Sequence, residues 1–454
     1  MNADLKYFRV SPSVVPADRT STVRIRSLDG IFRFYDDTPY QVQFIPMEYP
    51  DTPTDAAMTL LGADQNRPVF TVYPNGGVLE LEHFFAHEQE WRIRVWCDPA
   101  AYAPHTNPLY AEYDPYWQWL IDRPGQGVYL SVYALGEELY GTRPRRADLH
   151  LHTTGSDGSE SPALVAARYR GAGYDAIAVT DHNRFDTAAA AAAQLEGVTA
   201  LRILRGEEVH NGYVGFFHVV NIGSRYSVNQ LYLEQPERVA AETAALEDTV
   251  PVPPGVDAAE YRKRVWLYRA IKAAGGTAIY PHPYWLVGAH YHTDTAMSRA
   301  ILQNGLCDAY EVYGGVHPEG MDLQEALYHE MRADGCDIPV VGSTDCHSVL
   351  KDGFAAAATV ALCRAGESVI DAVLDHRSTA VQTLPGETPH VTGHLRAVAY
   401  TCFLLRTWFA LHDELCGVAG RLLEDVAAGD DSAIPAVQAA EARLAALEKE
   451  FFGA

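Results

Sequence analysis

Hydrophobic and polar positions follow two successive patterns along the chain. Up to about residue 145, short runs alternate hydrophobic with polar residues and are separated by Pro, Gly and Asp; the clearest runs are residues 22–26, 40–44, 91–96 and 128–133. Alternation with a period of two is typical of strands that bury one face, and its repetition at this spacing favours two packed antiparallel sheets. We therefore expect an N-terminal antiparallel β-sandwich domain over residues 1–145.

The tryptophans of this region are Trp91, Trp96, Trp117 and Trp119, and they could form a platform for a sugar. Core packing explains them better, because aromatic side chains dominate the cores of small β domains. The region holds no cluster of residue types that would carry catalysis. The chemistry is therefore expected further along the chain.

From residue 146 the pattern changes to apolar strands that alternate with helical segments. The expected strands are residues 147–151, 176–179, 201–204, 214–220, 277–280, 309–312 and 338–341. The helical segments between them include residues 161–172, 257–274 and 323–333. Such alternation predicts an α/β fold with a parallel sheet, and seven strands close into a barrel more easily than they stay open. We expect this barrel over residues 146–388, followed by an α-helical hairpin over 389–454 that serves packing or homo-oligomerisation.

Composition narrows the classes of partner. A chain of 454 residues with 48% hydrophobic and 21% charged residues suits a globular protein of two or three domains. Its formal net charge of −24 argues against nucleic acid as a partner, because that binding depends on basic residues facing phosphates. We expect neither a secretory signal nor a membrane span, since no apolar run is long enough. Seven cysteines without Cys-x-x-Cys spacing favour the reducing cytoplasm.

Histidines and carboxylates gather where the predicted barrel strands end. The first strand runs into His150-x-His152, which share one face of an extended segment, and a turn then brings Asp157 back toward them. Later strands add His182, Glu208, His218, His282, Asp345 and His347. Such side chains should converge, because the carboxyl ends of parallel strands meet at one face of a barrel. Nine imidazoles and carboxylates without a thiolate suit two or three divalent ions of zinc, iron or manganese.

Two insertions interrupt the barrel pattern. Residues 224–254 are longer than an ordinary connection and are expected to cap the barrel mouth. Residues 286–295 contain a second His-x-His, His290 and His292, which does not follow an apolar strand; we interpret this pair as solvated loop histidines. Cys346, between two candidate ligands, should point the opposite way and pack rather than coordinate.

Several motifs together resemble those of the PHP family, named for polymerase and histidinol phosphatase. In chain order they are His150-x-His152, Ser156-Asp157-Gly158, Thr180-Asp181-His182, the Gly-x-Glu that ends at Glu208, His282-Pro283 and Asp345-x-His347. The resemblance covers residues 146–384 and implies a distorted (β/α)7 PHP barrel. The flanking sandwich and the Asp-Leu-His-x-His entry look like the subgroup that includes carbaryl hydrolase.

The resemblance also implies a centre of up to three metal ions. The first ion would be held by His150, His152, Glu208 and Asp345, the second by Asp157, His182 and His347, and the third by His218 and His282 with Glu208 as a bridge. Many relatives have His where Asp157 stands, so the second site is expected to bind more weakly or to prefer a harder metal. Glu208 is favoured over Glu207 because the glycine of the family motif precedes its ligand by two residues.

A metal-dependent hydrolase is the predicted function, with His150, His152, Asp345 and His347 as the catalytic candidates. A hydroxide that bridges two ions would attack a small-molecule substrate, and the third ion would stabilise the oxygen that gains charge. A phosphoesterase is favoured; a carboxyl ester, amide or carbamate hydrolase is the alternative, and a non-catalytic metal-binding module is a second one. The candidate substrate contacts are Arg184, which could equally be an ordinary surface cation, Tyr284 and Tyr313.

Overall fold

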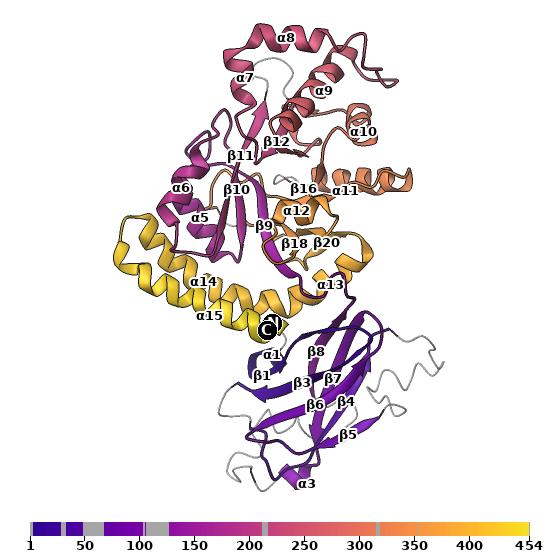
Figure 1. Cartoon of the computed structure of the whole chain (residues 1–454), viewed down its shortest axis with the longest axis vertical. Coiled ribbons are helices and arrows are strands. Elements are labelled where there is room, and N and C mark those ends of the chain that lie inside the picture. The colour runs from indigo at the N-terminus through magenta and orange to yellow at the C-terminus, as the bar shows by residue number, and fades with distance from the viewer. Residues whose placement is uncertain are drawn as a thin grey trace. The chain divides into compact units, whose positions relative to one another are not determined.

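The described residues of the computed structural model, 3–28, 33–48, 68–102, 105, 127–210, 217–314, 318–351 and 353–453, form a mixed α/β structure. The chain divides into two compact units. Figure 1 shows the chain coloured by residue number. The first combines residues 1–141 with 403–411 and 444–454, and the second combines 142–402 with 412–443. The C-terminal helices therefore contribute to both units, and the division into domains 1–145, 146–388 and 389–454 stays a prediction.

The first unit contains two β-sheets that share one apolar core. The three-stranded sheet has the order β1 (Phe8–Ser11), β3 (Arg19–Ser27), β6 (Val78–Phe85); the five-stranded sheet has the order β2 (Val14–Pro16), β8 (Val128–Leu135), β7 (Gln89–Cys97), β4 (Tyr40–Pro46), β5 (Val69–Val72). All these strands pair antiparallel except β2 and β8, which are parallel. The short helices α1 (Ala3–Tyr7) and α3 (Pro99–Tyr102) also belong to this unit, together with the parts of the C-terminal helices given above.

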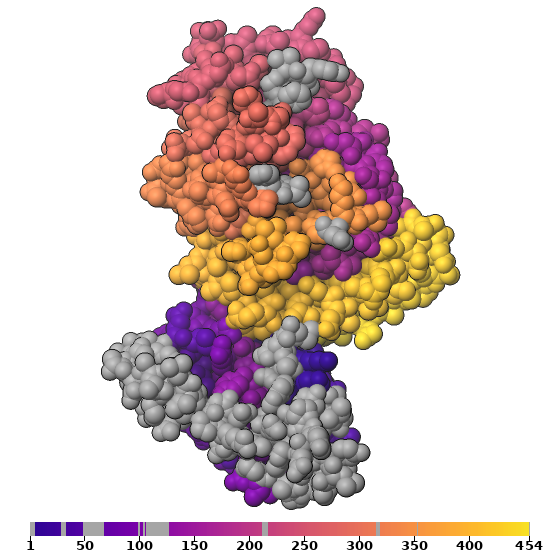
Figure 2. All heavy atoms as spheres, turned by 180° about the vertical axis from the view of Figure 1, so that it is seen from behind, coloured from indigo at the N-terminus to yellow at the C-terminus, as the bar shows by residue number. Residues whose placement is uncertain are grey.

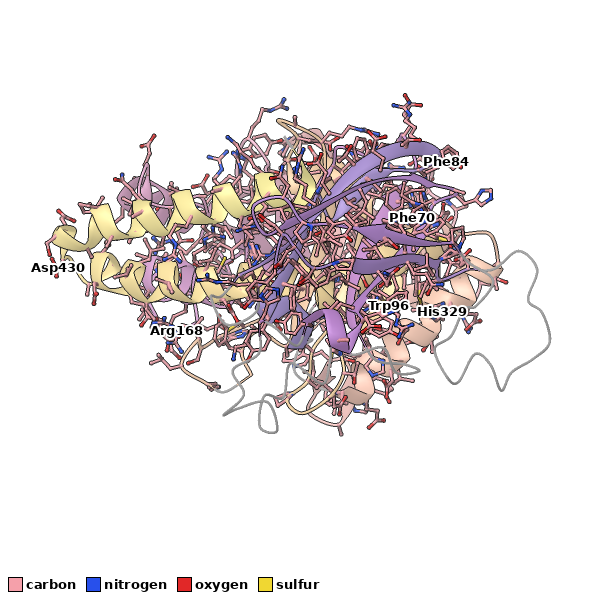
Figure 3. All side chains as sticks on the ribbon, turned by 90° about the horizontal axis from the view of Figure 1, so that it is seen from below. Phe70, Phe84, Trp96, Arg168, His329 and Asp430 are labelled. Atoms are coloured by element: carbon pink, nitrogen blue, oxygen red, sulfur yellow. The ribbon has the colours of Figure 1, made fainter. Side chains whose placement is uncertain are left out.

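Alternate residues of these strands point inward, as the period-two pattern predicts. Val23, Ile25 and Ile93 lie in this core without exposed surface. Trp91 and Trp96 are also buried, which fits core packing, whereas the other two tryptophans of the region lie outside the described residues. The exposed rings of Phe70 and Phe84 mark the solvent side of β5 and β6 in Figure 3.

The second unit is built on a ten-stranded sheet. Its order is β17 (Val340–Gly342), β16 (Ala309–Tyr313), β13 (Thr277–Tyr280), β12 (His218–Ile222), β11 (Arg202–His210), β10 (Ala176–Val179), β9 (Arg143–Leu151), β18 (Ala357–Cys363), β19 (Ser378–Gln382), β20 (His390–Gly393). The sheet is nearly closed, because the segment after β17 returns to β9. There the amide of His152 donates to the carbonyl of Cys346 at 2.8 Å, and the amide of Asp345 donates to the carbonyl of His150 at 2.9 Å.

Of the seven expected strands, one departs from the parallel arrangement, and the later strands β18, β19 and β20 also pair antiparallel. β12 is antiparallel to both of its neighbours, β11 and β13, whereas β9, β10 and β11 are parallel to one another, as are β13, β16 and β17. The first residue of β12, His218, therefore pairs with the last residue of β11, His210. The antiparallel direction is what brings His218 to the face where the parallel strands end.

Helices connect most of these strands, and several begin at side chains that cap them. They are α5 (Pro162–Gly171), α6 (Thr187–Leu195), α7 (Asn229–Glu234), α8 (Pro236–Ala244), α9 (Ala258–Ala273), α10 (Thr295–Gln303), α11 (Pro318–Ala333) and α12 (Val369–Leu374). The side chains of Ser161, Asp257 and Asp294 accept hydrogen bonds from the first turns of α5, α9 and α10. A capped start beside an apolar face explains why the predicted helices 161–172 and 257–274 form where they do.

The C-terminal helices are α13 (Leu395–Arg406), α14 (Trp408–Ala427) and α15 (Ile434–Phe452). Figure 3 shows α14 and α15 side by side, with Asp430 at the turn between them. Within the second unit, α14 crosses α5 where glycines meet: a Cβ on Gly420 would stand 2.2 Å from the Cα of Gly171. Figure 2 shows the yellow C-terminal helices lying along the purple segment that contains α5.

Buried charges reinforce this packing. Arg170 donates to Glu441 of α15 at 2.5 Å and to Asp175 at 3.1 Å, and His412 of α14 contacts the same Asp175 carboxylate at 3.1 Å. Removing one partner from such a buried network leaves an uncompensated charge, which is strongly destabilising. No helix of the described chain combines the length and apolar character needed to cross a bilayer.

Candidate metal centre

The turn after β9 is folded back by hydrogen bonds to Asp181. This carboxylate accepts from the amide of Thr153 at 2.7 Å, from its hydroxyl at 2.6 Å and from the hydroxyl of Ser156 at 2.8 Å. Gly158 passes so close to β9 that a Cβ there would lie 2.6 Å from the backbone of His152. The Thr-Thr-Gly-Ser-Asp-Gly composition thus fixes a tight loop beside the two histidines.

Potential metal ligands from several strands converge at this face of the barrel. The described residues contain four overlapping groups here whose ligand atoms lie within 4.8 Å of one another: His150, Glu208, His282 and Asp345; His152, Asp345 and His347; His152, His182 and Glu208; and His218, His282 and His292. Eight of the nine residues predicted from the sequence are among them. Asp157 belongs to none of the four, and His292 was not predicted.

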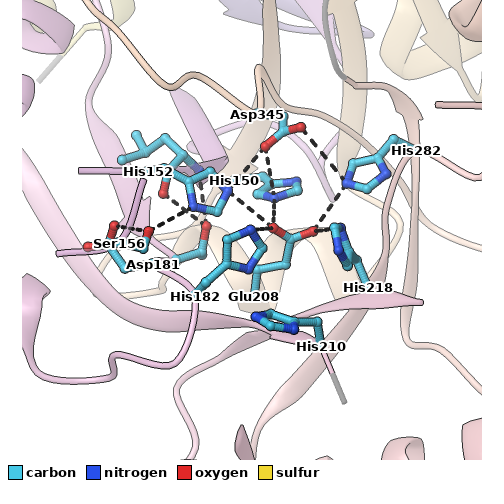
Figure 4. Close-up of polar contacts among 12 residues, drawn as sticks. His150, His152, Ser156, Asp181, His182, Glu208, His210, His218, His282 and Asp345 are labelled. Atoms are coloured by element: carbon cyan, nitrogen blue, oxygen red, sulfur yellow. Dashed lines mark hydrogen bonds and ion pairs between the residues drawn. The ribbon is translucent and has the colours of Figure 1, made fainter. Parts of the chain in front are cut away.

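Glu208 is the centre of this arrangement, as Figure 4 shows. Its Oε2 atom lies 3.2 Å from His150 Nε2, 3.1 Å from His152 Nε2 and 3.3 Å from His182 Nε2. Its Oε1 atom faces a different set, with His218 Nδ1 at 2.7 Å and His282 Nε2 at 3.2 Å. Each oxygen of this buried carboxylate therefore faces a different group of histidines, which is the arrangement expected of a carboxylate that bridges two ions.

Asp345 completes the set around His150 and His152. Its Oδ1 atom is 3.4 Å from His150 Nε2 and 3.1 Å from His152 Nε2. Two ligands about 2.1 Å from one tetrahedral ion stand roughly 3.4 Å apart, so these separations match atoms that share a cation. His150 Nε2, His152 Nε2 and Asp345 Oδ1 are all buried without a hydrogen-bond partner among the described residues. The residues present therefore fit a divalent metal ion, which would satisfy these atoms.

Asp157 lies at the edge of the centre and is about half exposed. Its Oδ2 atom is 3.3 Å from His347 Nε2, and its Oδ1 atom is 3.6 Å from His152 Nδ1. The Nδ1 of His347 in turn lies 2.8 Å from the carbonyl oxygen of Asp345, which leaves its Nε2 for Asp157 or a cation. The predicted second set of Asp157, His182 and His347 is thus not brought together as one cluster here, because His182 faces Glu208 instead.

The histidines and carboxylates of the centre shift one another's pKa values. Burial lowers the pKa of His152, but the carboxylates of Asp345 and Glu208 outweigh it and raise the pKa to about 9. Burial raises the pKa of Glu208, but His218 and His150 outweigh it and hold the pKa well below its ordinary value. Burial lowers the pKa of His182 to about 4. In the metal-free protein His152 is therefore protonated at neutral pH, and it must release a proton before it binds a cation.

Two of the candidate ligands lie in backbone conformations that residues other than glycine rarely adopt. His282 has φ of 23° and Asp345 has φ of 51°. Positive φ at such residues costs free energy and concentrates at functional sites, where the surrounding structure holds it. His282 lies two residues after β13 ends and Asp345 lies three residues after β17 ends, and in these turns His282 faces Glu208 while Asp345 faces His150 and His152.

The structure also separates the neighbouring glutamates. Glu207 points away from the centre and accepts from Asn221 Nδ2 at 2.8 Å, from the Ser227 hydroxyl at 2.5 Å and from the amide of Val228 at 2.6 Å. It thereby anchors the start of residues 224–254, which contain α7 and α8. Asn229 of α7 donates to the carbonyl of Glu208 at 3.0 Å and accepts from the amide of His210 at 3.2 Å, which places this insertion at the ligand-bearing end of β11.

Three further residues of the site were missed in the sequence. Glu311 on β16 is fully buried, and its Oε2 lies 3.0 Å from His150 Nδ1. A charged residue inside an apolar strand was the signal that could have identified it. His210 stacks edge-on to His182 with ring centroids 4.8 Å apart. His292 lies against His218, which corrects its interpretation as a solvated residue, whereas its neighbour His290 is exposed.

The three predicted substrate contacts differ in their exposure to solvent. Arg184 is half exposed and pairs with Asp186 at 3.2 Å. Tyr284 and Tyr313 are buried in the apolar core, and their hydroxyl groups contact Thr295 at 3.1 Å and Thr392 at 3.0 Å. Neither tyrosine ring is open to a substrate in this structure, because core packing uses it. Cys346 is likewise buried in an apolar cluster, as expected from its alternation with the ligands.

A separate group outside the centre consists of Asp337, His376 and His394. His394 Nε2 lies 3.2 Å from the Asp337 carboxylate, while Arg332 contacts His394 Nδ1 at 3.4 Å. The guanidinium beside Nδ1 leaves Nε2 as the nitrogen that faces the Asp337 carboxylate. An ion-pair network therefore explains this group.

Comparisons with known proteins give a limited picture. No family model and no curated protein matches the chain. Similar solved structures include a two-domain protein containing a predicted PHP-like metal-dependent phosphoesterase from Bacteroides vulgatus, with 19% identity and a TM-score of 0.36 over 53% of this chain and 65% of that one. The chain thus spans just under two thirds of that protein.

Two other similar structures are shorter. A protein described as a metal-dependent phosphoesterase from Bifidobacterium adolescentis has 17% identity and a TM-score of 0.34 over 50% of this chain and 95% of that one. An amidohydrolase from Chromobacterium violaceum, with bound sulfate and no metal, has 19% identity and a TM-score of 0.29 over 44% of this chain and 87% of that one. At these TM-scores neither fold nor activity is inferred from the likeness.

Proposed function

We propose that the chain is a PHP-type metal-dependent hydrolase whose centre binds two or three divalent ions, with zinc, manganese and iron as the candidates. The observation that supports this most directly is the Glu208 carboxylate, whose Oε2 faces His150 and His152 while its Oε1 faces His218 and His282. Hydrolases with two neighbouring metal ions use such a centre to activate water and to bind the reacting group. Within this proposal the barrel is the distorted (β/α)7 type and the first unit is the accompanying sandwich.

When bound, such ions lower the pKa of a coordinated water and polarise the oxygen that gains charge. The protein's own residues prepare for this chemistry. Glu311 accepts from His150 Nδ1 and so directs its Nε2 into the centre. Asp181 holds the loop that follows His152, and this loop carries Asp157.

His210 lies beside the centre and is a candidate for proton transfer to the leaving group. His210 is partly exposed at the end of β11, with its ring 4.8 Å from that of His182. Asn183 Nδ2 lies 3.0 Å from its Nε2 and can donate to it, so the neutral ring carries its proton on Nδ1. Burial lowers the pKa of His210, so its ring is neutral near pH 7. We assign it to proton transfer in which it would first accept the proton that the attacking water loses and would then donate that proton to the leaving group.

The favoured substrate is a small phosphorylated molecule. A centre of several cations suits a phosphoryl group, whose oxygens gain charge in the transition state. Arg184 can meet such an anion if it leaves its exposed pair with Asp186, a pair that contributes little by itself.

An ester, amide or carbamate is the second candidate, and the exposed apolar hairpin beside the centre favours it. Trp285, Leu286, Val287 and Tyr291 each expose more than a third of their surface. The Trp285 ring lies 5.9 Å from that of His218. An uncharged substrate with an apolar group would use this surface better than a phosphate would.

A substrate panel on the metal-loaded protein tests the proposal. Turnover of phosphomonoesters or phosphodiesters supports the favoured function, and turnover restricted to esters, amides or carbamates supports the second candidate. His152→Ala should abolish either activity while the thermal transition of the metal-free protein persists, because the imidazole is a ligand at the shared face. Bound metal without turnover of any substrate would favour a non-catalytic metal-binding module instead.

The remaining expectations stay proposals of the same kind. A small molecule is the proposed partner, with neither nucleic acid nor membrane, and the C-terminal helices are a candidate surface for homo-oligomerisation. The cytoplasmic location also stays a proposal, which rests on the cysteine spacing in the sequence.

A further inference from the structure

The hairpin that follows His282 returns the chain to the metal centre. It consists of β14 (Leu286–Val287) and β15 (His290–Tyr291), which pair antiparallel. At its base the amide of His292 donates to the carbonyl of Trp285 at 2.7 Å, and the amide of Thr293 donates to that of Pro283 at 2.9 Å. Ten residues after His282, the chain therefore presents a second histidine at the same place.

The His292 ring lies among the ligands of the centre. Its centroid is 4.6 Å from that of His218 and 5.5 Å from that of His282. One nitrogen from each of these three rings lies within 4.8 Å of the other two. The three imidazoles therefore share a point that one ion could occupy.

Both ring nitrogens of His292 are buried and lack a hydrogen-bond partner among the described residues. Leaving a buried polar atom without a partner costs about 1–3 kcal/mol, and buried side-chain nitrogens in proteins are nearly always bonded. Packing alone does not explain a histidine here, because an apolar residue would fill the space without this cost. A metal ion that accepts the lone pair of one ring nitrogen would remove this cost at that nitrogen.

We propose that His292 is an additional protein ligand of the ion held by His218 and His282, and that this makes the position imidazole-rich and selective for Zn²⁺ over Mn²⁺. Three imidazoles suit zinc, whereas carboxylates suit manganese and magnesium. The position around His150 and Asp345 is richer in carboxylates, so the two parts of the centre differ in the metal they prefer. The inference rests on the proposed function, since it refines one site of the proposed centre.

Metal binding at His292 would also fix the hairpin. Trp285, at the base of β14, has its ring 5.6 Å from that of His292 and 5.9 Å from that of His218. An ion bound between those imidazoles ties the apolar hairpin surface to the centre. The hairpin should therefore resist proteolysis in the zinc form more than in the metal-free form.

The hairpin itself offers a matched control. His290 is the same residue type two positions earlier, but it is exposed and belongs to no ligand group. We expect His292→Ala to weaken binding of one equivalent of Zn²⁺ by at least about tenfold, a loss found even for residues that only support a ligand. His290→Ala should bind like the unsubstituted protein. Titration of the metal-free full-length proteins with Zn²⁺ and with Mn²⁺, in competition with a chromophoric chelator, measures these affinities.

A second variant detects ligation directly. His292→Cys places a thiolate where the imidazole stood, and loading with Co²⁺ should then produce a sulfur-to-metal charge-transfer band that His290→Cys does not show. Unchanged Zn²⁺ binding by His292→Ala, or the absence of that band from a folded His292→Cys, would overturn the assignment while leaving the proposed function intact. Equal weakening of every equivalent would also overturn it, because His292 would then act on the fold. Failure of the unsubstituted protein to bind even one equivalent of metal would instead contradict the proposed function.

Discussion

Glu311→Gln tests whether the centre depends on a buried carboxylate behind its ligands. Glu311 Oε2 lies 3.0 Å from His150 Nδ1, and neither side chain has exposed surface. With Nδ1 donating to Glu311, the lone pair of Nε2 points at Glu208 and Asp345. Such a carboxylate behind a histidine fixes its tautomer and makes it a more basic ligand.

The expected loss follows from this contact. A hydrogen bond to a charged group contributes about 1.5–3 kcal/mol, which corresponds to roughly 10- to 150-fold in the dissociation constant for metal. Glutamine keeps an acceptor oxygen but lacks the negative charge, so the loss of metal affinity should lie near the lower end of this range. The thermal transition of the metal-free protein should change much less, since the histidine remains surrounded by Glu208 and Asp345.

Chelator competition on the metal-free protein measures the affinity, and Glu207→Gln is the matched control. Glu207 is an equally buried carboxylate whose partners are Asn221, Ser227 and the amide of Val228, all outside the ligand set. We expect the control to lose folding stability and to keep its affinity for metal. The reasoning is refuted if Glu311→Gln binds metal within twofold of the unsubstituted protein, or if both variants lose affinity equally.

The other predictions concern the loop, the second ion and the packing of the C-terminal helices. Asp157→Ala should weaken one equivalent of metal selectively, because the carboxylate lies at the edge of the centre, near His347 and the outer nitrogen of His152; titration that shows all equivalents weakened together contradicts this. Gly158→Ala should cost about 1–3 kcal/mol, since its Cβ would stand 2.6 Å from backbone; an unchanged melting temperature argues against this tight packing. His412→Gln should destabilise the protein most in mildly acidic solution. Burial lowers the pKa of His412, but the Asp175 carboxylate has the larger effect and raises this pKa well above its ordinary value. The charged imidazole therefore contributes its full stabilisation below the pKa of an unfolded histidine, about 6.5. The contribution is lost as the pH rises through the higher pKa of the folded protein. A destabilisation by His412→Gln that grows with pH would contradict this prediction.

Much of the second unit could be predicted because its strands are short, apolar and bounded by clear signals. Strands 176–179 and 277–280 were predicted with the bounds that β10 and β13 have in the structure. The direction of β12 could not be read from its sequence, because an apolar run has the same pattern in either orientation. That direction nevertheless decides where His218 lies.

Site residues were predictable where they follow an apolar strand and not elsewhere. His150, His152 and Glu208 meet this condition, and each lies in a ligand group. His292 reaches the same place only because a hairpin returns it there, and sequence spacing gives no sign of that closure. Tyr284 and Tyr313 are predicted substrate contacts because a tyrosine can stack on a ring, but burial of a tyrosine depends on tertiary packing that local sequence does not reveal.

The metal content of the purified full-length protein tests the central claim most directly, measured after growth with added zinc and manganese and combined with anomalous scattering from crystals. The account predicts two or three ions per chain, with Glu208 in contact with two of them. Less than one equivalent of transition metal, or ions bound away from Glu208, would contradict it.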